Sequence, residues 1–99
     1  MKIIWTPLAL QRADEMASHI ALDNPAAALA WLKALFAKVE RLIRFPESGR
    51  RVPEAERSEI REILHGNCRI IYRLSKGKVI LLTLRHSRRY FVLEGESSK

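Results

Sequence analysis

Apolar residues in the first half of the chain recur at helical spacing. A short apolar run over residues 2–5 precedes Thr6 and Pro7, a pair typical of a helix N-cap followed by the first helical residue. The next apolar positions follow one another at intervals of three and four residues: Ala9, Ala13, Met16 and Ile20. This pattern predicts a short strand and then an amphipathic helix over residues 7–22.

A second helix is predicted over residues 25–44. Asn24 and Pro25 repeat the signal of a cap followed by proline. The apolar positions that follow give the strongest helical period in the chain: Ala28, Leu32, Leu35, Phe36, Val39, Leu42 and Ile43. Because the connection between the two helices is short, we expect them to form an antiparallel hairpin.

The hydrophobic period changes in the second half of the chain. Residues 45–56 contain two prolines and a glycine, which predicts a loop. Alternation of apolar and polar residues then predicts strands over residues 59–64 and 68–74. The continuous apolar run within residues 79–86 predicts a strand buried on both faces. Together these elements predict an α+β fold, in which a short N-terminal strand and a two-helix hairpin accompany a small antiparallel sheet, with the helices on one of its faces.

Length and composition favour one small domain. The 99 residues, 47% of them hydrophobic, suit a single core, and we expect the domain to span residues 1–93 with a disordered tail over residues 94–99. A single cysteine, Cys68, excludes an internal disulfide and favours a reducing, cytoplasmic location. The sequence has neither an apolar stretch long enough to cross a bilayer nor the apolar block of a signal peptide, so we expect no membrane partner.

The net charge of +7 is concentrated in the second half of the chain. Residues 1–43 hold five Lys and Arg against four Asp and Glu, whereas residues 44–89 hold twelve against five. A positive field on one part of a protein attracts polyanions and acidic proteins and is screened by salt. We therefore expect a nucleic acid or an acidic protein as partner, with simple solubility as the plainer interpretation of the charge.

Four motifs in the second half resemble those of RelE/ParE-type toxins. They are Pro46-x-x-Gly49-Arg50-x-Val52-Pro53-Glu54, Arg61-Glu62-Ile63, Arg69-Ile70-Ile71-Tyr72-Arg73, and an apolar strand ending on Arg85-His86-x-Arg88-Arg89. With the helix pair, the resemblance covers residues 2–91. It implies the RelE/ParE-like toxin fold and a toxin of a bacterial type II toxin–antitoxin system. It also implies a cognate antitoxin that wraps and neutralises the toxin in a hetero-oligomer.

The resemblance leaves two activities open, and only one of them makes the protein an enzyme. RelE-like members cut mRNA in the ribosomal A site, which requires a proton acceptor, a proton donor and cations on the phosphate. In that case Glu62 lies where some relatives have a carboxylate base, and Arg69 and Arg88 resemble the phosphate-holding arginines. His86 or Tyr90 would donate the proton.

ParE-like members instead poison DNA gyrase, and the side chains favour this activity. RelE-like enzymes often place lysines on the strand that corresponds to residues 60–64, but this chain has no lysine between Lys38 and Lys76. Arginine, with a pKa above about 12, holds phosphate but is a poor acid or base. We expect the target to be bound by arginines of the second half: Arg61, Arg69, Arg73, Arg85, Arg88 and Arg89.

Several of these residues also have a structural interpretation. Glu62 can neutralise an arginine across the sheet, and Arg69 can form a bidentate ion pair. Tyr72 and Cys68 fall on the apolar side of their strand, which favours core positions. His86 ends a strand, where a lone histidine is usually structural or solvated.

Two classes outside the active toxins stay open, a plain nucleic-acid-binding module and an inactive family member that only binds a partner. The first would need interleaved aromatic residues or a recognition helix, whereas the arginines here lie on predicted loops and strands. The histidines and the cysteine do not show the spacing of metal ligands, and no phosphate-binding glycine loop is present. We therefore expect neither a metal nor a cofactor.

Overall fold

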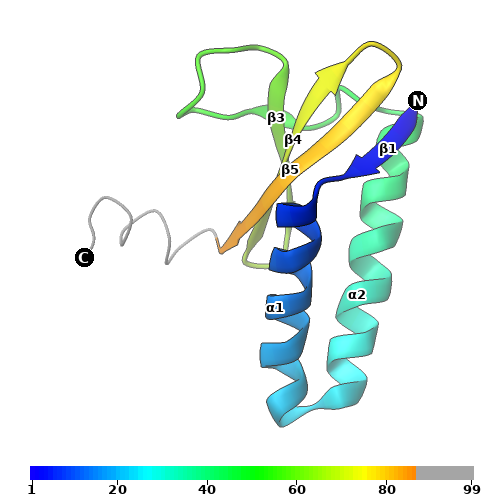
Figure 1. Ribbon diagram of the computed structural model, residues 1–99, viewed down its shortest axis with the longest axis vertical. Coiled ribbons are helices and arrows are strands. Elements are labelled where there is room, and N and C mark those ends of the chain that lie inside the picture. Colours follow the sequence, from blue (N-terminus) through cyan, green and yellow to red (C-terminus); the bar gives the residue numbers. More distant parts are fainter. Residues whose placement is uncertain (87–99) are drawn as a thin grey trace.

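Residues 1–86 are described by a computed structural model of the chain, in which a helix hairpin accompanies a five-stranded sheet (Figure 1). The elements are β1 (Lys2–Trp5), α1 (Pro7–Asp23), α2 (Pro25–Glu40), the 3₁₀ helix η1 (Arg41–Ile43), β2 (Arg50–Arg51), β3 (Ile60–His65), β4 (Cys68–Ser75) and β5 (Lys78–His86). The predicted α+β fold is confirmed. The expected end of the domain at residue 93 and the expected tail over residues 94–99 lie outside the described residues.

Both helices begin at the caps that the sequence predicts. The Thr6 hydroxyl oxygen accepts a hydrogen bond from the Ala9 amide at 3.1 Å and donates one to the Leu81 carbonyl at 2.7 Å, which joins the start of α1 to β5. At α2, the Asn24 side-chain oxygen accepts from the Ala27 amide at 3.0 Å. Each cap satisfies an amide that has no partner within its helix.

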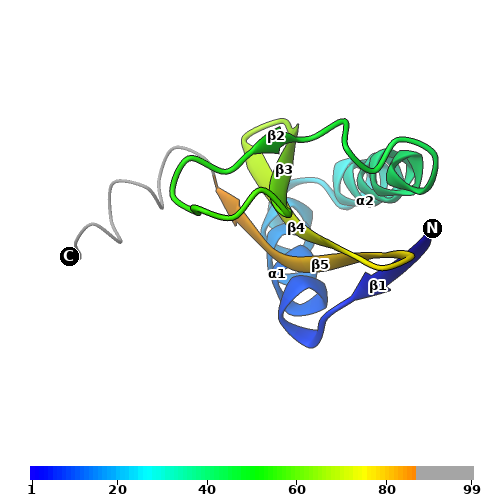
Figure 2. The same cartoon turned by 90° about the horizontal axis from the view of Figure 1, so that it is seen from above.

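The sheet is mixed, because β1 joins it in parallel. The strand order is β1-β5-β4-β3-β2, and β1 pairs with β5 from Lys2 opposite Lys78 to Trp5 opposite Leu81. All the other pairs are antiparallel. Viewed from above, β4 and β5 cross the middle of the molecule, with β1 on one side and β2 and β3 on the other (Figure 2). The three long strands β3, β4 and β5 form the antiparallel sheet that the sequence predicts, and β1 adds a parallel edge strand to it. The connection from β1 to β5 runs through every element between them, beginning with the helix hairpin.

The predicted loop over residues 45–56 contains the short edge strand β2. Arg50 lies opposite Glu62 on β3, in antiparallel pairing. A strand of two residues is too short to give a periodic signal, so the sequence could not predict it. The turns that join β3 to β4 and β4 to β5 contain Gly66 and Gly77 with φ of 61° and 65°, a conformation that glycine adopts without strain.

The helix hairpin packs on one face of the sheet, and the core lies between the two. The core residues are Ala9 and Ala13 of α1, Leu35 and Val39 of α2, Leu42 of η1, and Cys68, Ile70, Tyr72, Val79, Leu81 and Leu84 of the sheet. Tyr72 and Cys68 are thus core residues, as their positions in the alternating pattern predict. Polar contacts between the hairpin and the sheet add to this apolar burial, among them those of Thr6 with the Leu81 carbonyl and of Lys38 with the Leu64 carbonyl.

The expectation that the strand within residues 79–86 is buried on both faces is wrong. Only its helix-facing positions are buried, and the positions between them are half-buried because no helix covers the second face. The register shifts at Leu82, which has no partner on β4, so that Leu81 and Leu84 both face the helices. The strand buried on both sides is instead β4, whose first five residues are all buried at the middle of the sheet.

Two residues of the predicted helical stripe are exposed rather than buried. Phe36 lies beside α2's buried side and packs edge-on against Trp5, with ring centroids 5.3 Å apart. Ile43 follows Phe36 by seven residues and is exposed on the 3₁₀ helix that continues α2 after Glu40.

Candidate functional site

The register of the sheet divides the candidate residues between its two faces. Residues opposite each other in neighbouring strands point to the same face. Arg69 lies opposite Arg85, and Glu62 lies opposite Ile71. Because alternate residues of a strand point to the same face, Ile71 shares its face with Arg69 and Arg73. These four charged residues therefore share the face that the helices leave open. We call it the arginine face and define it by Glu62, Arg69, Arg73 and Arg85.

The other candidates lie on the face that the helices cover. His86 is opposite Cys68, a core residue, and Arg61 is opposite Tyr72, another core residue. The sheet therefore separates His86 from Glu62, so this candidate proton donor and the candidate base do not face a common space. Strand register sets this separation, and spacing along the sequence does not reveal it. Tyr90, the other candidate donor, lies outside the described residues.

Glu62 and Arg69 form the centre of a buried ion network. The Arg69 guanidinium donates from Nε to Glu62 Oε1 at 2.7 Å and makes a bidentate pair with Glu54, both hydrogen bonds being 3.0 Å long. Arg50 Nε donates to the second carboxylate oxygen of Glu62. The Glu62 side chain is 0% exposed and that of Arg69 is 3% exposed. The structural interpretations of both residues, a cross-strand charge pair and a bidentate arginine, are confirmed.

The network favours the charged forms of Glu54 and Arg69. Hydrogen bonds from Arg69 lower the pKa of Glu54, although partial burial opposes them. Burial works against the charge of Arg69, but hydrogen bonds to Glu54 and Glu62 outweigh it and raise the pKa of Arg69. A carboxylate with an arginine on each oxygen is well suited to organising the sheet, and it has no exposed surface at which to accept a substrate proton.

Arg61 organises a loop on the helix-covered face. Its Nη1 donates to the Gly49 carbonyl at 2.9 Å and to the Glu47 carbonyl at 3.3 Å. The Tyr72 hydroxyl fixes the same loop, because it donates to the Pro46 carbonyl at 2.7 Å and accepts from the Gly49 amide at 3.0 Å. A Cβ at Gly49 would lie 2.5 Å from that hydroxyl oxygen, so the close approach requires glycine.

The remaining candidate arginines lie on the arginine face or beyond the described residues. Arg73 is half-buried opposite Ile60, and its Nε is buried without a hydrogen-bond partner in the part of the chain that the structure describes. Aliphatic side chains lie between the charges on this face: Ile60, Ile71 and Ile80. Arg88, Arg89 and Tyr90 fall outside the described residues. The arginine face thus offers guanidinium donors over an apolar floor, a combination that suits phosphates or an acidic, partly apolar peptide.

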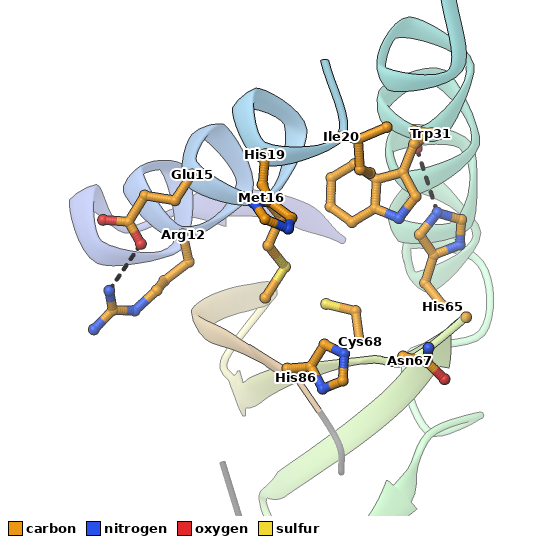
Figure 3. Close-up of a pocket in the computed structure, with 11 residues that line it drawn as sticks. Arg12, Glu15, Met16, His19, Ile20, Trp31, His65, Asn67, Cys68 and His86 are labelled. Carbon is orange, nitrogen blue, oxygen red and sulfur yellow. Dashed lines mark hydrogen bonds and ion pairs between the residues drawn. The ribbon is translucent and has the colours of Figure 1, made fainter. Parts of the chain in front are cut away.

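A pocket opens on the helix side, where the hairpin meets the end of the sheet (Figure 3). Its volume is about 590 Å³. Met16, Ile20 and Trp31 supply its apolar walls. Its other lining residues include the three histidines of the chain and the single cysteine: His19, His65, His86 and Cys68. The pocket can accept an apolar side chain from a partner.

Two polar groups of the pocket, His65 and Cys68, favour their neutral forms, whereas Arg12 and Glu15, which also line it, form a salt bridge with each other. Burial lowers the pKa of His65, whose Nε2 lies 3.3 Å from the Trp31 carbonyl oxygen in a hydrogen bond, and the charge of Lys38 lowers it further. Burial also raises the pKa of the Cys68 thiol to about 11, so the thiol stays protonated and is a poor nucleophile near neutral pH. The apolar walls and these two neutral side chains suit an apolar occupant.

Sequence reasoning missed this pocket and gave His19 and His65 no role. His65 reaches it from the end of β3, and His86 reaches it because β5 pairs with β4 there, which no local pattern indicates. Within residues 1–86, no three His, Cys, Asp or Glu side chains are grouped so as to hold a metal ion. Among the helices in the same range, none is both long and apolar enough to cross a membrane.

Comparisons with known proteins agree on fold and family. A solved structure described as the chromosomal ParDE TA system from P. aeruginosa has the same fold, with a TM-score of 0.72 and 20% sequence identity over 87% of this chain and 95% of that chain. The sequence profile of a family described as the ParE toxin of the type II toxin-antitoxin system, parDE, matches residues 3–91. The chain therefore belongs to the ParE toxin family, which confirms the resemblance and its ParE-like branch. A comparison with curated proteins found no match.

Proposed function

We propose that this ParE-family toxin acts by poisoning DNA gyrase, holding the enzyme in a cleavage complex on DNA. The observation that carries the proposal is the separation of Glu62 from His86 by the sheet. Strand scission of RNA by general acid and base catalysis requires both groups to reach the same phosphodiester. Poisoning requires only a binding surface, for which the chain has the arginine face.

The arginines of this face divide into two roles in the proposal. Arg73 and Arg85 are half-buried and contact the target or its DNA, together with Arg88 and Arg89, which follow β5 in the sequence. Guanidinium groups bind phosphate oxygens and carboxylates in a bidentate manner and keep their charge at any physiological pH. Arg69 is a positioning residue, because its guanidinium is already engaged by Glu54 and Glu62.

A cognate antitoxin neutralises the toxin by covering the arginine face and the pocket. An acidic segment complements the excess positive charge of the second half of the chain, and apolar residues within that segment anchor in the pocket against Trp31. The result is a toxin–antitoxin hetero-oligomer. The alternative activity, ribosome-dependent cleavage of mRNA with Glu62 as base, has less support because Glu62 is buried between Arg50 and Arg69.

A gyrase assay tests the proposal. Purified toxin is added to gyrase and supercoiled DNA, and the products are separated after the protein has been denatured. We expect linear DNA, or DNA covalently attached to gyrase, to accumulate with toxin concentration. Addition of the cognate antitoxin beforehand should prevent this. Unchanged gyrase activity at saturating toxin would contradict the proposal.

A further inference from the structure

Three large apolar side chains form an exposed stripe along α2 and η1. Leu29, Phe36 and Ile43 are 55%, 44% and 41% exposed. Leu29 and Phe36 are seven residues apart on α2, which is two helical turns to within about 20°, and Ile43 follows after seven more residues, at the end of η1. They therefore lie along one side of the helix, next to the buried side formed by Leu35 and Val39. We call these three residues the α2 stripe.

The stripe is bordered by opposite charges at matching positions. Lys33 follows Leu29 by four residues, and Glu40 follows Phe36 by four residues, so both lie on the same flank of the stripe. Both are exposed, and neither makes a salt bridge with another residue in the range 1–86. Ala37 borders the stripe further round the helix and is small enough to let another helix approach closely.

This arrangement is complementary to itself. Two copies of α2 can be placed antiparallel about a twofold axis between Phe36 and Ala37. Lys33 of each copy then lies opposite Glu40 of the other, which gives two equivalent ion pairs. The two Phe36 side chains meet near the axis, and Leu29 of each copy approaches the partner copy at the level of Ile43. We propose that the α2 stripe is a homodimer interface, formed by two copies of this chain packed antiparallel along α2.

The charges favour a second copy over a different partner. The flank of the stripe carries one Lys and one Glu and so has no net charge, whereas the acidic antitoxin proposed above complements the arginine face. Trp31 points from α2 into the pocket (Figure 3). Lys38 donates a hydrogen bond to the Leu64 carbonyl on β3 at 2.9 Å, so these two residues lie on another side of the helix. Dimer formation therefore leaves the pocket and the arginine face accessible.

The interface is small, so the dimer should be weak. A helix of 16 residues is about 24 Å long, which limits the area that two such helices can bury. We expect a dissociation constant of about 10–100 µM, as for other small interfaces. Sedimentation equilibrium of the isolated full-length toxin measures this constant directly. Phe36→Asp should weaken association at least tenfold, and the matched control Leu64→Asp, at an exposed position on β3, should leave it unchanged.

A charge exchange tests the antiparallel register without changing the apolar contacts. Lys33→Glu places like charges together twice in the dimer and should weaken association about tenfold. The double variant Lys33→Glu with Glu40→Lys restores opposite charges and should recover the wild-type constant. A toxin that stays monomeric to about 200 µM overturns the proposal. The proposal is also overturned if the double variant associates no more tightly than Lys33→Glu alone. It is overturned as well if the toxin associates only when the antitoxin is present and this association is lost in Phe36→Asp.

Discussion

Glu62 and His86 lie on opposite faces of the central sheet. Glu62 is held between Arg50 and Arg69 on the face that the helices leave open, and His86 lines the pocket beneath the helix hairpin. A base and an acid that act on one phosphodiester must both be within hydrogen-bonding reach of it. The two groups therefore cannot serve one cleavage reaction in this fold, and we interpret the arginine face as a binding surface.

Glu62→Gln should destabilise the protein. The substitution removes the negative charge that Arg50 and Arg69 share in a site with no exposed surface, and it should lower the free energy of unfolding by about 2–4 kcal/mol. Urea unfolding followed by circular dichroism measures this. The matched control Glu54→Gln removes a half-exposed partner of the same Arg69, so it should lower the free energy of unfolding by a smaller amount. Equal losses for the two variants would contradict the central place given to Glu62.

Folded Glu62→Gln should still poison gyrase. If Glu62 were instead the base of an mRNA-cleavage reaction, its removal would slow that cleavage about 10²- to 10⁴-fold. The assay is run at a temperature where circular dichroism shows the variant to be folded. Poisoning retained within about tenfold is the result expected of a structural carboxylate. Loss of poisoning in the folded variant, or mRNA breaks made by the wild type and lost in Glu62→Gln, would contradict it.

Charge reversal on the arginine face should weaken poisoning without unfolding the protein. Arg85→Glu places a negative charge at a position that we propose contacts the target, so it should weaken poisoning about 10- to 100-fold. Arg41→Glu is the matched control, because Arg41 is an exposed arginine of η1, outside the arginine face. Titration of each toxin against gyrase gives the comparison. Equal effects of the two reversals would show that net charge matters rather than the arginine face.

Stability should decrease as the pH falls below about 6.5, and His65 should contribute to the decrease. Burial lowers the pKa of His65 below its usual value of 6.5, so the folded protein favours the neutral ring. The stabilising effect is present above pH 6.5 and is lost as the pH falls toward the folded-state pKa, because the unfolded chain binds the proton more readily. Melting temperatures at pH 7.5 and pH 5.5 should differ less in His65→Gln than in the wild type. The same substitution at the exposed His19 is the control, and an unchanged difference in His65→Gln would contradict the account.

Salt should slow the association of the toxin with its antitoxin. The arginine face attracts an acidic segment at long range, and added salt screens that attraction while leaving the apolar contacts of the pocket intact. Stopped-flow measurements at several salt concentrations should show an association rate that falls more steeply than the dissociation rate rises. An association rate independent of salt would exclude electrostatic attraction as the basis of recognition.

The sequence predicted those parts of the fold that depend on local periodicity. The two helices, their caps at Thr6 and Asn24 and the three long strands follow from apolar spacing and cap residues, which act over a few positions. The parallel pairing of β1 and the shift at Leu82 depend on contacts distant in the sequence, and local patterns do not encode them.

The sequence also predicted only the part of the candidate site that depends on local alternation. Alternation placed Arg69 and Arg73 on one side of their strand, and the structure brings Arg85 beside them. Strand pairing alone decides that Arg61 and His86 belong to the opposite face, and that His86 shares a pocket with His65. The residue types indicated the chemistry, but the register determines which groups can act together.

A parallel assay of purified toxin on gyrase and on translating ribosomes tests the central claim most directly. One reaction holds gyrase with supercoiled DNA, the other a reconstituted translation system with a defined mRNA, and both receive the same toxin concentrations. The account predicts linear or covalently trapped DNA in the first reaction and intact mRNA in the second. Position-specific breaks in the ribosome-bound mRNA, with gyrase unaffected at saturating toxin, would contradict it.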